Sequence, residues 1–152
     1  MKKYILAILV LTSVLSCKKD AFVHPDYMIF GSIQGDCSQG CRFVYYLDAT
    51  KLAEDSTVKY FSTKDLADFK KQLSNDQFLL AKDLLNKVPV ALTKTTRNIF
   101  IDLNASSPDL WYAEIHAGGR TYSWTFDNSE SGTPAYLKSF ADEMIRTIDL
   151  LR

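Results

Sequence analysis

Residues 110–126 read LWYAEIHAGGRTYSWTF, two alternating stretches that meet at Gly118 and Gly119. Two glycines between alternating strands are typical of a two-residue hairpin turn, because such turns need positive φ angles that glycine adopts readily. The turn sets a register in which small Ala113 lies opposite large Trp124. The predicted pairs are Ala117 with Arg120, Ile115 with Tyr122, Ala113 with Trp124, and Trp111 with Phe126.

This hairpin has two different faces, because successive side chains of a strand point to opposite sides of the sheet. We expect the face that carries Trp111, Ala113 and Trp124 to be covered by a C-terminal helix. We expect the opposite face to meet solvent. Its residues are Tyr112, Glu114, His116, Thr121, Ser123 and Thr125.

Three shorter stretches upstream of the hairpin favour strands. They are residues 27–33, residues 41–47, and residues 51–54 after a turn at 48–50. Aromatic and β-branched residues or alternating patterns mark each of them. Residues 55–63 are polar, and we expect them to be irregular, although residues 58–61 could pair briefly as a strand. Residues 65–73 fit either a helix or a strand, and both interpretations stay open.

Two later stretches predict amphipathic helices. Ser74 is a good N-cap for a helix over residues 75–87, and Pro89 ends that pattern. Thr133 and Pro134 supply the cap and the first-turn proline of a second helix toward the C-terminus. These elements predict the α+β class, with a small antiparallel sheet of hairpins packed against two amphipathic helices. A chain of this length can bury one core, so residues 26–152 are expected to form a single domain.

The N-terminus has the order of a secretory signal. Lys2 and Lys3 precede an apolar run over residues 4–11, and a short exit leads to Cys17. A membrane-spanning helix needs roughly 20 apolar residues, and this run is shorter. The pattern therefore predicts export of the chain that follows.

The ending Val14-Leu15-Ser16-Cys17 resembles the lipobox of bacterial lipoproteins. The resemblance implies that residues 1–16 are a signal peptide and that Cys17 becomes the lipidated first residue, carrying acyl chains such as palmitate. Two or more acyl chains hold a protein stably on a membrane. Residues 17–25, which include His24, would then form a lipidated tether. The alternative is an ordinary cleaved signal with an incidental cysteine.

Cys37 and Cys41 remain as a pair once Cys17 is assigned to the lipid. Export leads to an oxidising compartment, and Gly35 and Gly40 permit the turn that a disulfide would need. A structural disulfide is favoured, while free thiols and a functional C-x3-C site stay open. No second cysteine pair or histidine cluster accompanies the pair, so no metal or other cofactor is predicted.

Several short motifs resemble a family of small uncharacterised lipoproteins of Bacteroidota. They are the pair Cys37 and Cys41 followed by residues 43–47, residues 51–55, residues 73–75 followed by residues 81–85, the dipeptide Pro108-Asp109, and residues 122–124. The resemblance covers most of the mature chain and brings no assigned chemistry, so it carries over no catalytic residue. The chain departs from the family after Asp109, where Leu110-Trp111-Tyr112 follows directly in place of a glycine- and tryptophan-bearing loop.

Charge and motifs exclude several classes of function. Lys and Arg number 18, as do Asp and Glu, and this balance argues against a nucleic-acid partner. The sequence contains no phosphate-binding glycine loop and no serine-hydrolase or zinc-protease motif. Glu114 and His116, two apart on one strand with Ser123 across, are the only acid–base candidates in the folded region. A solvated strand face explains them better, so no enzyme is expected.

The favoured function is a non-enzymatic lipoprotein of the cell envelope, held at the outer membrane and facing either the periplasm or the cell surface. Its candidate binding face, for an envelope protein or a small ligand, consists of Tyr112, Glu114, His116 and Ser123. One alternative is an inhibitor or sequestering protein that uses the stapled loop 34–41. The other is an enzyme that uses His116 and Glu114. Asp55-Ser56-Thr57 also resembles a bacterial O-glycosylation acceptor, which makes Ser56 a candidate for modification.

Overall fold

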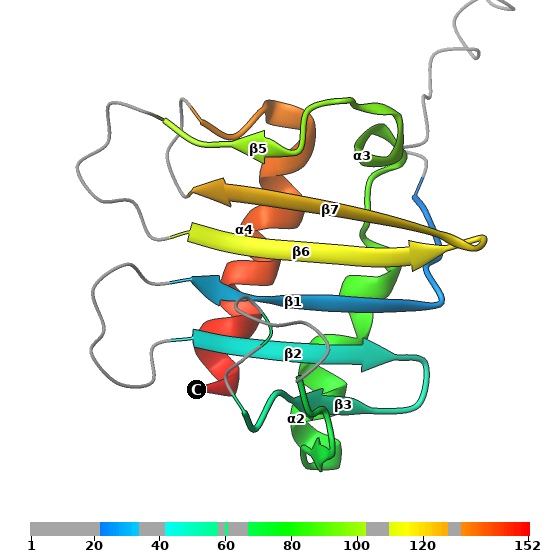
Figure 1. The fold of residues 1–152 in the computed structure, drawn as a ribbon, viewed down its shortest axis with the longest axis vertical. Coiled ribbons are helices and arrows are strands. Elements are labelled where there is room, and N and C mark those ends of the chain that lie inside the picture. Colours follow the sequence, from blue (N-terminus) through cyan, green and yellow to red (C-terminus); the bar gives the residue numbers. More distant parts are fainter. Residues whose placement is uncertain (1–21, 34–41, 58–59, 61–66, 103–109, 128–131) are drawn as a thin grey trace, which may run out of the picture.

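A computed structural model describes residues 22–33, 42–57, 60, 67–102, 110–127 and 132–152 (Figure 1). In this part of the chain, seven strands form one sheet in the order β4-β3-β2-β1-β6-β7-β5. The strands are β1 (Tyr27–Ile33), β2 (Arg42–Asp48), β3 (Leu52–Glu54), β4 (Lys71–Gln72), β5 (Ile99–Phe100), β6 (Leu110–Ala117) and β7 (Arg120–Asp127). Neighbouring strands pair antiparallel, except that β5 runs parallel to β7.

The β6–β7 hairpin confirms the register that the sequence predicts. Trp111 pairs with Phe126, and Ala113 with Trp124, and the ladder continues to the pair of Ala117 and Arg120 at the turn. Gly118 and Gly119 have φ angles of 56° and 74°. These are left-handed conformations that other residues adopt only with strain, which explains why the turn has two glycines.

Strand β1 is the middle strand of the sheet. It pairs with β2 on one side, where Phe30 meets Tyr45, and with β6 on the other, where Phe30 meets Ala113. The predicted bounds of this strand, 27–33, are confirmed. Because β1 bonds to both neighbours, it joins the β2–β3 hairpin and the β6–β7 hairpin into one continuous sheet.

The turn between β2 and β3 is built on the side chain of Asp48. Its carboxylate accepts hydrogen bonds from the backbone N–H of Thr50 at 2.7 Å and of Lys51 at 3.0 Å. These bonds hold the pKa of Asp48 below its ordinary value, although burial acts in the opposite direction. The turn predicted at 48–50 is therefore confirmed, with an aspartate as its organising group.

The segment 65–73, for which helix and strand both stayed open, contains only the two-residue edge strand β4 in its described part. Ser74 then caps helix α2 (Asn75–Ala81), accepting from Gln77 N in a complete capping box. The helix predicted over 75–87 is thus divided, because α2 tightens into the 3-10 helix η3 (Lys82–Asn86).

Two more helices follow. Pro89 caps the short helix α3 (Val90–Lys94), which the sequence analysis did not predict, because five residues leave no clear periodicity. Helix α4 (Ala135–Leu151) begins one residue later than predicted, with Pro134 as its N-cap. The hydroxyl of Thr133 instead donates to the carbonyl of Asp127 at 2.9 Å.

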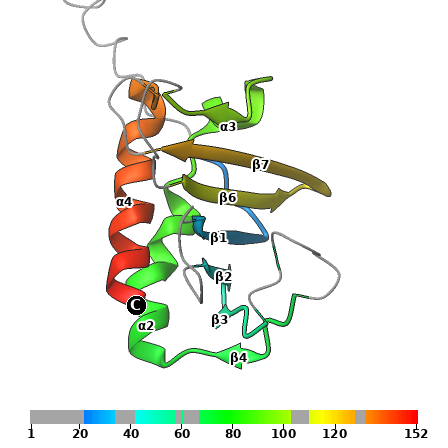
Figure 2. The same cartoon turned by 60° about the vertical axis from the view of Figure 1, so that its left-hand side comes forward.

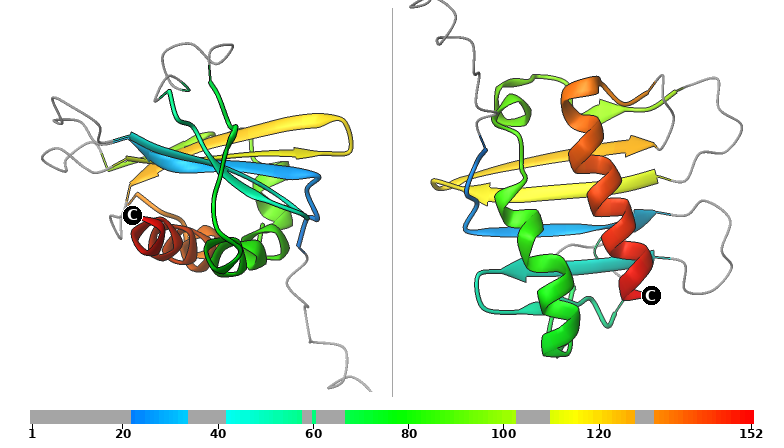
Figure 3. Two further views of the ribbon diagram at one scale, coloured as in Figure 1. Left: turned by 90° about the horizontal axis from the view of Figure 1, so that it is seen from below. Right: turned by 180° about the vertical axis from the view of Figure 1, so that it is seen from behind.

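Among the described helices, α2, η3 and α4 cover one face of the sheet, and the short α3 lies beside the start of α4 at the β7 end (Figures 2 and 3). Alternate residues of the strands point into this layer and meet α4, as expected for the apolar face of the hairpin. The largest fully buried side chains include Phe30, Tyr45, Phe126, Phe140 and Leu137. The main core therefore lies between the sheet and the helical layer.

The predicted fold class is wrong. The expected architecture was a small antiparallel sheet of hairpins against two amphipathic helices, whereas the described residues form one seven-stranded mixed sheet with three α-helices. Sheet predominates, so the α+β description fits only in part. The parallel strand β5 has two residues, and the β1–β6 pairing joins distant segments, so neither could be recognised from local patterns.

The expectation that the other face of the hairpin simply meets solvent is also wrong for its central part. Tyr60, Ala67 and Phe69 pack over the sheet there and form a second apolar cluster with Ile29 and Val44. Side chains on the β6 part of this face are consequently buried or half-buried, and Glu114 is only 6% exposed. We call this side of the sheet the outer face.

Substitution of Gly31 by alanine tests the close approach of β1 and β2. A Cβ at this position would overlap the carbonyl oxygen of Phe43 and lie 3.0 Å from the Cα of Val44. Because both obstacles are backbone atoms, we expect Gly31→Ala to lower the free energy of unfolding by about 3 kcal/mol. Chemical denaturation measures this change, with Thr121→Ala at an exposed strand position as the control. Equal stability of the two variants would contradict this packing.

Candidate functional site

Three aromatic side chains form a row across β2, β1 and β6 on the outer face. The ring of Tyr27 stacks on Tyr46 with centroids 5.3 Å apart, and on His116 with centroids 5.0 Å apart and planes within 2°. Tyr27 and His116 are direct partners in the β1–β6 ladder, so strand pairing brings their rings together. All three side chains are half-buried. We call Tyr46, Tyr27 and His116 the outer aromatic row.

A carboxylate fixes the orientation of the imidazole at one end of this row. The Nδ1 atom of His116 lies 3.1 Å from Oδ2 of Asp26, whose backbone N–H donates to the His116 carbonyl at 2.7 Å. The side chain of Asp26 is 63% exposed and that of His116 is 31% exposed. The pair is therefore accessible from solvent, and Nε2 is the imidazole nitrogen that Asp26 does not engage.

A second polar group, formed by Tyr112 and Glu114, lies beside the outer aromatic row and next to the Tyr60 side chain. The hydroxyl of Tyr112 donates to Oε2 of Glu114 at 2.5 Å, and the Tyr60 and Tyr112 ring centroids are 5.8 Å apart. Burial, followed by the nearby Tyr112 hydroxyl and Glu114 carboxylate, raises the pKa of Tyr60 above its ordinary range. Tyr60 therefore stays neutral, and Glu114 acts as a buried hydrogen-bond acceptor.

The four residues of the predicted binding face, Tyr112, Glu114, His116 and Ser123, do lie on one face of the sheet. They do not form one cluster. Glu114 bonds to Tyr112, His116 contacts Asp26, and half-buried Ser123 lies across the ladder from Glu114. The acid–base pair of Glu114 and His116 is thus divided between two different partners.

Sequence reasoning missed Asp26, Tyr27 and Tyr46, although the alternation of β1 and β2 places both tyrosines on the outer face.

Asp55 organises the segment that covers the outer face. The residue is 3% exposed, and among the described groups its carboxylate accepts from the backbone N–H of Thr57, Tyr60 and Asp68 at 3.0 Å and from the Thr57 hydroxyl at 2.6 Å. Burial alone would raise the pKa of Asp55, but these bonds outweigh it and hold the pKa below its ordinary value. The Asp55 carboxylate therefore binds groups that precede Tyr60 in the chain, the amide of Tyr60 itself, and one group that follows it.

The other sequence-predicted sites differ in how far the structure describes them. Ser56 is exposed, and its hydroxyl donates to the Asp68 carbonyl at 3.3 Å. Its O-glycosylation stays a prediction. The lipidation residue Cys17, the pair Cys37 and Cys41, and the loop 34–41 lie outside the described residues.

The described ranges contain neither a metal-ligand cluster nor a membrane-spanning helix. Within them, no group of three or more His, Cys, Asp or Glu side chains is arranged to hold a metal ion. No helix in the same residues is long and apolar enough to cross a bilayer.

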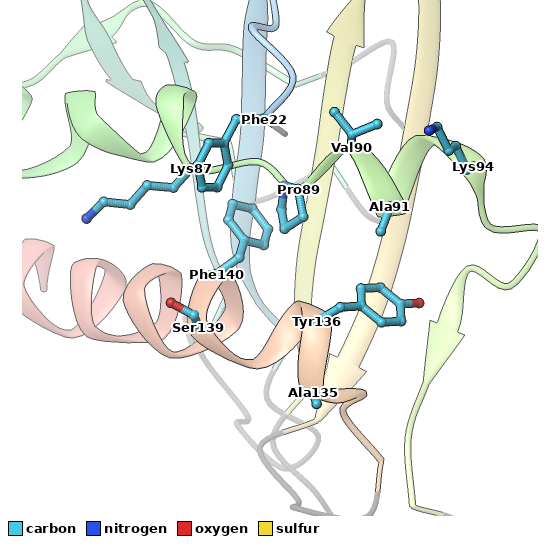
Figure 4. Close-up of a pocket in the computed structure, with 10 residues that line it drawn as sticks. All are labelled: Phe22, Lys87, Pro89, Val90, Ala91, Lys94, Ala135, Tyr136, Ser139 and Phe140. Atoms are coloured by element: carbon cyan, nitrogen blue, oxygen red, sulfur yellow. The ribbon is translucent and has the colours of Figure 1, made fainter. Parts of the chain in front are cut away.

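A groove on the helical side is a second candidate site, and sequence reasoning missed it. It lies between α3 and the first turns of α4 and has a volume of about 880 Å³ (Figure 4). Its apolar lining comes from Phe22, Pro89, Val90, Ala91, Tyr136 and Phe140. Lys87 and Lys94 stand at opposite ends of it. The only signal in the sequence was Phe22, an aromatic residue within the segment that was interpreted as a tether.

Phe22 reaches this groove because the chain contacts the helical layer before β1 begins. Val23 N donates to the carbonyl of Val88 at 2.8 Å, and Phe22 forms an isolated β-bridge with Pro89. Residues 22 and 23 are therefore attached to the domain. The groove lies where the described chain begins.

Comparison with known proteins gives no further assignment, because no family model, curated protein or solved structure matches the chain.

Replacing Asp55 by asparagine tests its role beneath the outer face. The amide keeps the shape of the carboxylate but loses its charge and half of its acceptor capacity. We expect Asp55→Asn to lower the free energy of unfolding at pH 7 by about 2 kcal/mol. The exposed Asp83→Asn serves as the control and should change it by less than about 0.5 kcal/mol.

The same variant has a distinct pH dependence. The folded-state pKa of Asp55 lies below its unfolded value of about 3.9, so its contribution is complete above that pH and is lost as the pH falls through the folded value. The stability difference between wild type and Asp55→Asn should therefore shrink below about pH 4. Denaturation at pH 7 and pH 3 measures this, and a difference that stays constant would contradict the assignment.

Proposed function

We propose that the chain is a lipid-anchored protein of the bacterial cell envelope and that its folded domain is a non-enzymatic binding module. The observation that carries the proposal is the N-terminal order of Lys2-Lys3, an apolar run over 4–11, and Cys17 after a short exit. This order matches the signal that directs a cysteine to lipid attachment. The second half of the proposal, the non-enzymatic binding module, concerns the folded domain.

Binding, rather than catalysis, fits the outer face. A hydrolytic site would need a nucleophile beside a base that a third group orients. Asp26 orients His116, but no hydrogen bond joins the imidazole to the Thr121 hydroxyl across the ladder among the described residues, and Glu114 is engaged by Tyr112. Half-exposed aromatic rings, in contrast, are typical of the centres of protein–ligand and protein–protein interfaces.

The chemistry of the outer aromatic row suggests the kind of partner. Its rings offer a flat apolar surface, and the exposed Asp26 at one end of the row offers carboxylate oxygens that can accept hydrogen bonds. A matching partner would bring a planar or apolar group together with hydrogen-bond donors or a positive charge. An envelope protein or a small envelope ligand could supply both.

Replacement of Cys17 tests the anchor. We expect Cys17→Ala to abolish incorporation of labelled palmitate and to move the protein from the membrane fraction to the soluble fraction, because the sulfur that would carry the lipid is gone. Ser13→Ala, a neighbouring substitution that keeps Cys17, should leave both properties unchanged. Membrane association of the Cys17→Ala variant equal to that of the wild type would refute the lipid anchor.

Replacement of His116 tests the binding face. We expect affinity capture from envelope extracts with wild-type protein to retain a partner that His116→Ala loses by about tenfold, because the variant removes one ring of the row and the contact to Asp26. Thr125→Ala, on the same face of β7, should retain the partner. Circular dichroism should show that both variants are folded. Equal capture by the two variants would exclude the outer aromatic row as the binding surface.

A further inference from the structure

We propose that the groove between α3 and α4 is the surface with which the anchored domain rests on the phospholipid bilayer. The groove is the apolar hollow lined by Phe22, Pro89 and Tyr136 (Figure 4). This inference rests on the proposed lipid at Cys17 and adds an orientation to it. The end of the domain that carries Phe22, α3 and the start of α4 would then lie next to the membrane, and the outer face would be free for a partner.

The length of chain before the groove limits how far the domain can lie from the membrane. Only residues 18–21 separate Cys17 from Phe22. A fully extended chain would span at most about 18 Å over this distance. Helix α4 has 17 residues and is about 25 Å long. The tether is therefore shorter than the helix, and it keeps the Phe22 end of the domain next to the lipid headgroups.

The side chains at this end suit the boundary between water and lipid. Phe22 and Tyr136 are each 45% exposed, which is unusual for such large rings. Aromatic rings concentrate at membrane interfaces, where tyrosine can place its ring in the apolar region and its hydroxyl in water. In Figure 4 the Tyr136 ring lies below Ala91, and its hydroxyl points toward the side of the groove on which Lys94 stands.

The charges around the groove point to the same partner. Residues 88–101 contain Lys94 and Arg97 and no acidic residue, and residues 133–141 contain Lys138 and no acidic residue. Lys87 pairs with Glu143 at 2.9 Å, and Lys138 with Asp142 at 3.6 Å.

Lys94 and Arg97, however, have no carboxylate partner among the described residues. These two unpaired cations make this end of the domain locally positive. Lipid phosphates would supply the missing negative charge.

A tryptophan reporter on α4 tests this orientation. The protein with its native lipid is placed in vesicles of phosphatidylglycerol and of phosphatidylcholine whose acyl chains carry bromine, which quenches nearby indole fluorescence. Tyr136→Trp places the reporter at the groove, and Leu150→Trp is the matched control at the other end of the same helix, at a position that is 53% exposed. The native Trp111 and Trp124 are 4% and 3% exposed, so they contribute a common background.

We expect the emission of Tyr136→Trp to fall about twofold on brominated vesicles. The emission of Leu150→Trp should change no more than that of the wild-type protein, which has only Trp111 and Trp124. Flotation of the vesicles is measured first and separates two kinds of failure. Protein that does not float with the vesicles would refute the anchor, and the orientation with it. Protein that floats while both reporters are quenched equally, or neither is, would refute the orientation alone.

Charge variants provide an independent readout. Lys94→Gln in the Tyr136→Trp background should weaken the quenching without reducing flotation, because the acyl chains still hold the protein. Lys82→Gln, an exposed lysine on the 3-10 helix η3, should change neither. A second copy of the chain could also occupy the groove. In that case the emission at position 136 would follow protein concentration rather than bromine, and the proposal would be wrong.

Discussion

The pairing of β1 with β6 is the constraint on which the rest of the molecule depends. It joins segments that are far apart in the sequence, since Asp26 and His116 lie 90 positions apart. Without it, the sheet would separate into the strands β4-β3-β2-β1 and the strands β6-β7-β5, and the core beneath the helices would be divided. With it, the core residues Phe30, Tyr45 and Ala113 lie side by side across three strands. The backbone approach at Gly31 shows how closely β1 fits against β2.

The same pairing places the two candidate sites on opposite sides of the sheet. On the outer face, it stacks Tyr27 on His116 and brings Asp26 to the imidazole. On the helical side, it determines where the chain preceding β1 must pass, which brings Phe22 against Pro89 at the groove. In the orientation that we propose, the groove end lies at the membrane and the outer face is left for a partner.

The sequence predicted the elements whose signals are local. The two glycines defined the β6–β7 register residue by residue, and Ser74 marked the start of α2. It did not predict what depends on distant contacts. The polar stretch after Glu54 is irregular in its described part, as predicted, but no local pattern indicated that Asp55 binds its backbone and that Tyr60 packs on the sheet. The groove was missed because its walls, Phe22, α3 and α4, come from three separate parts of the chain.

Native-state hydrogen exchange tests the central role of β1 most directly. The backbone amides of Met28 and Phe30 should exchange only when the whole domain unfolds, with the same free energy as the most protected amides of β6. Exchange of the β1 amides at denaturant concentrations where the β6–β7 hairpin stays protected would contradict this account, because the hairpin would then be stable without the strand that unites the sheet.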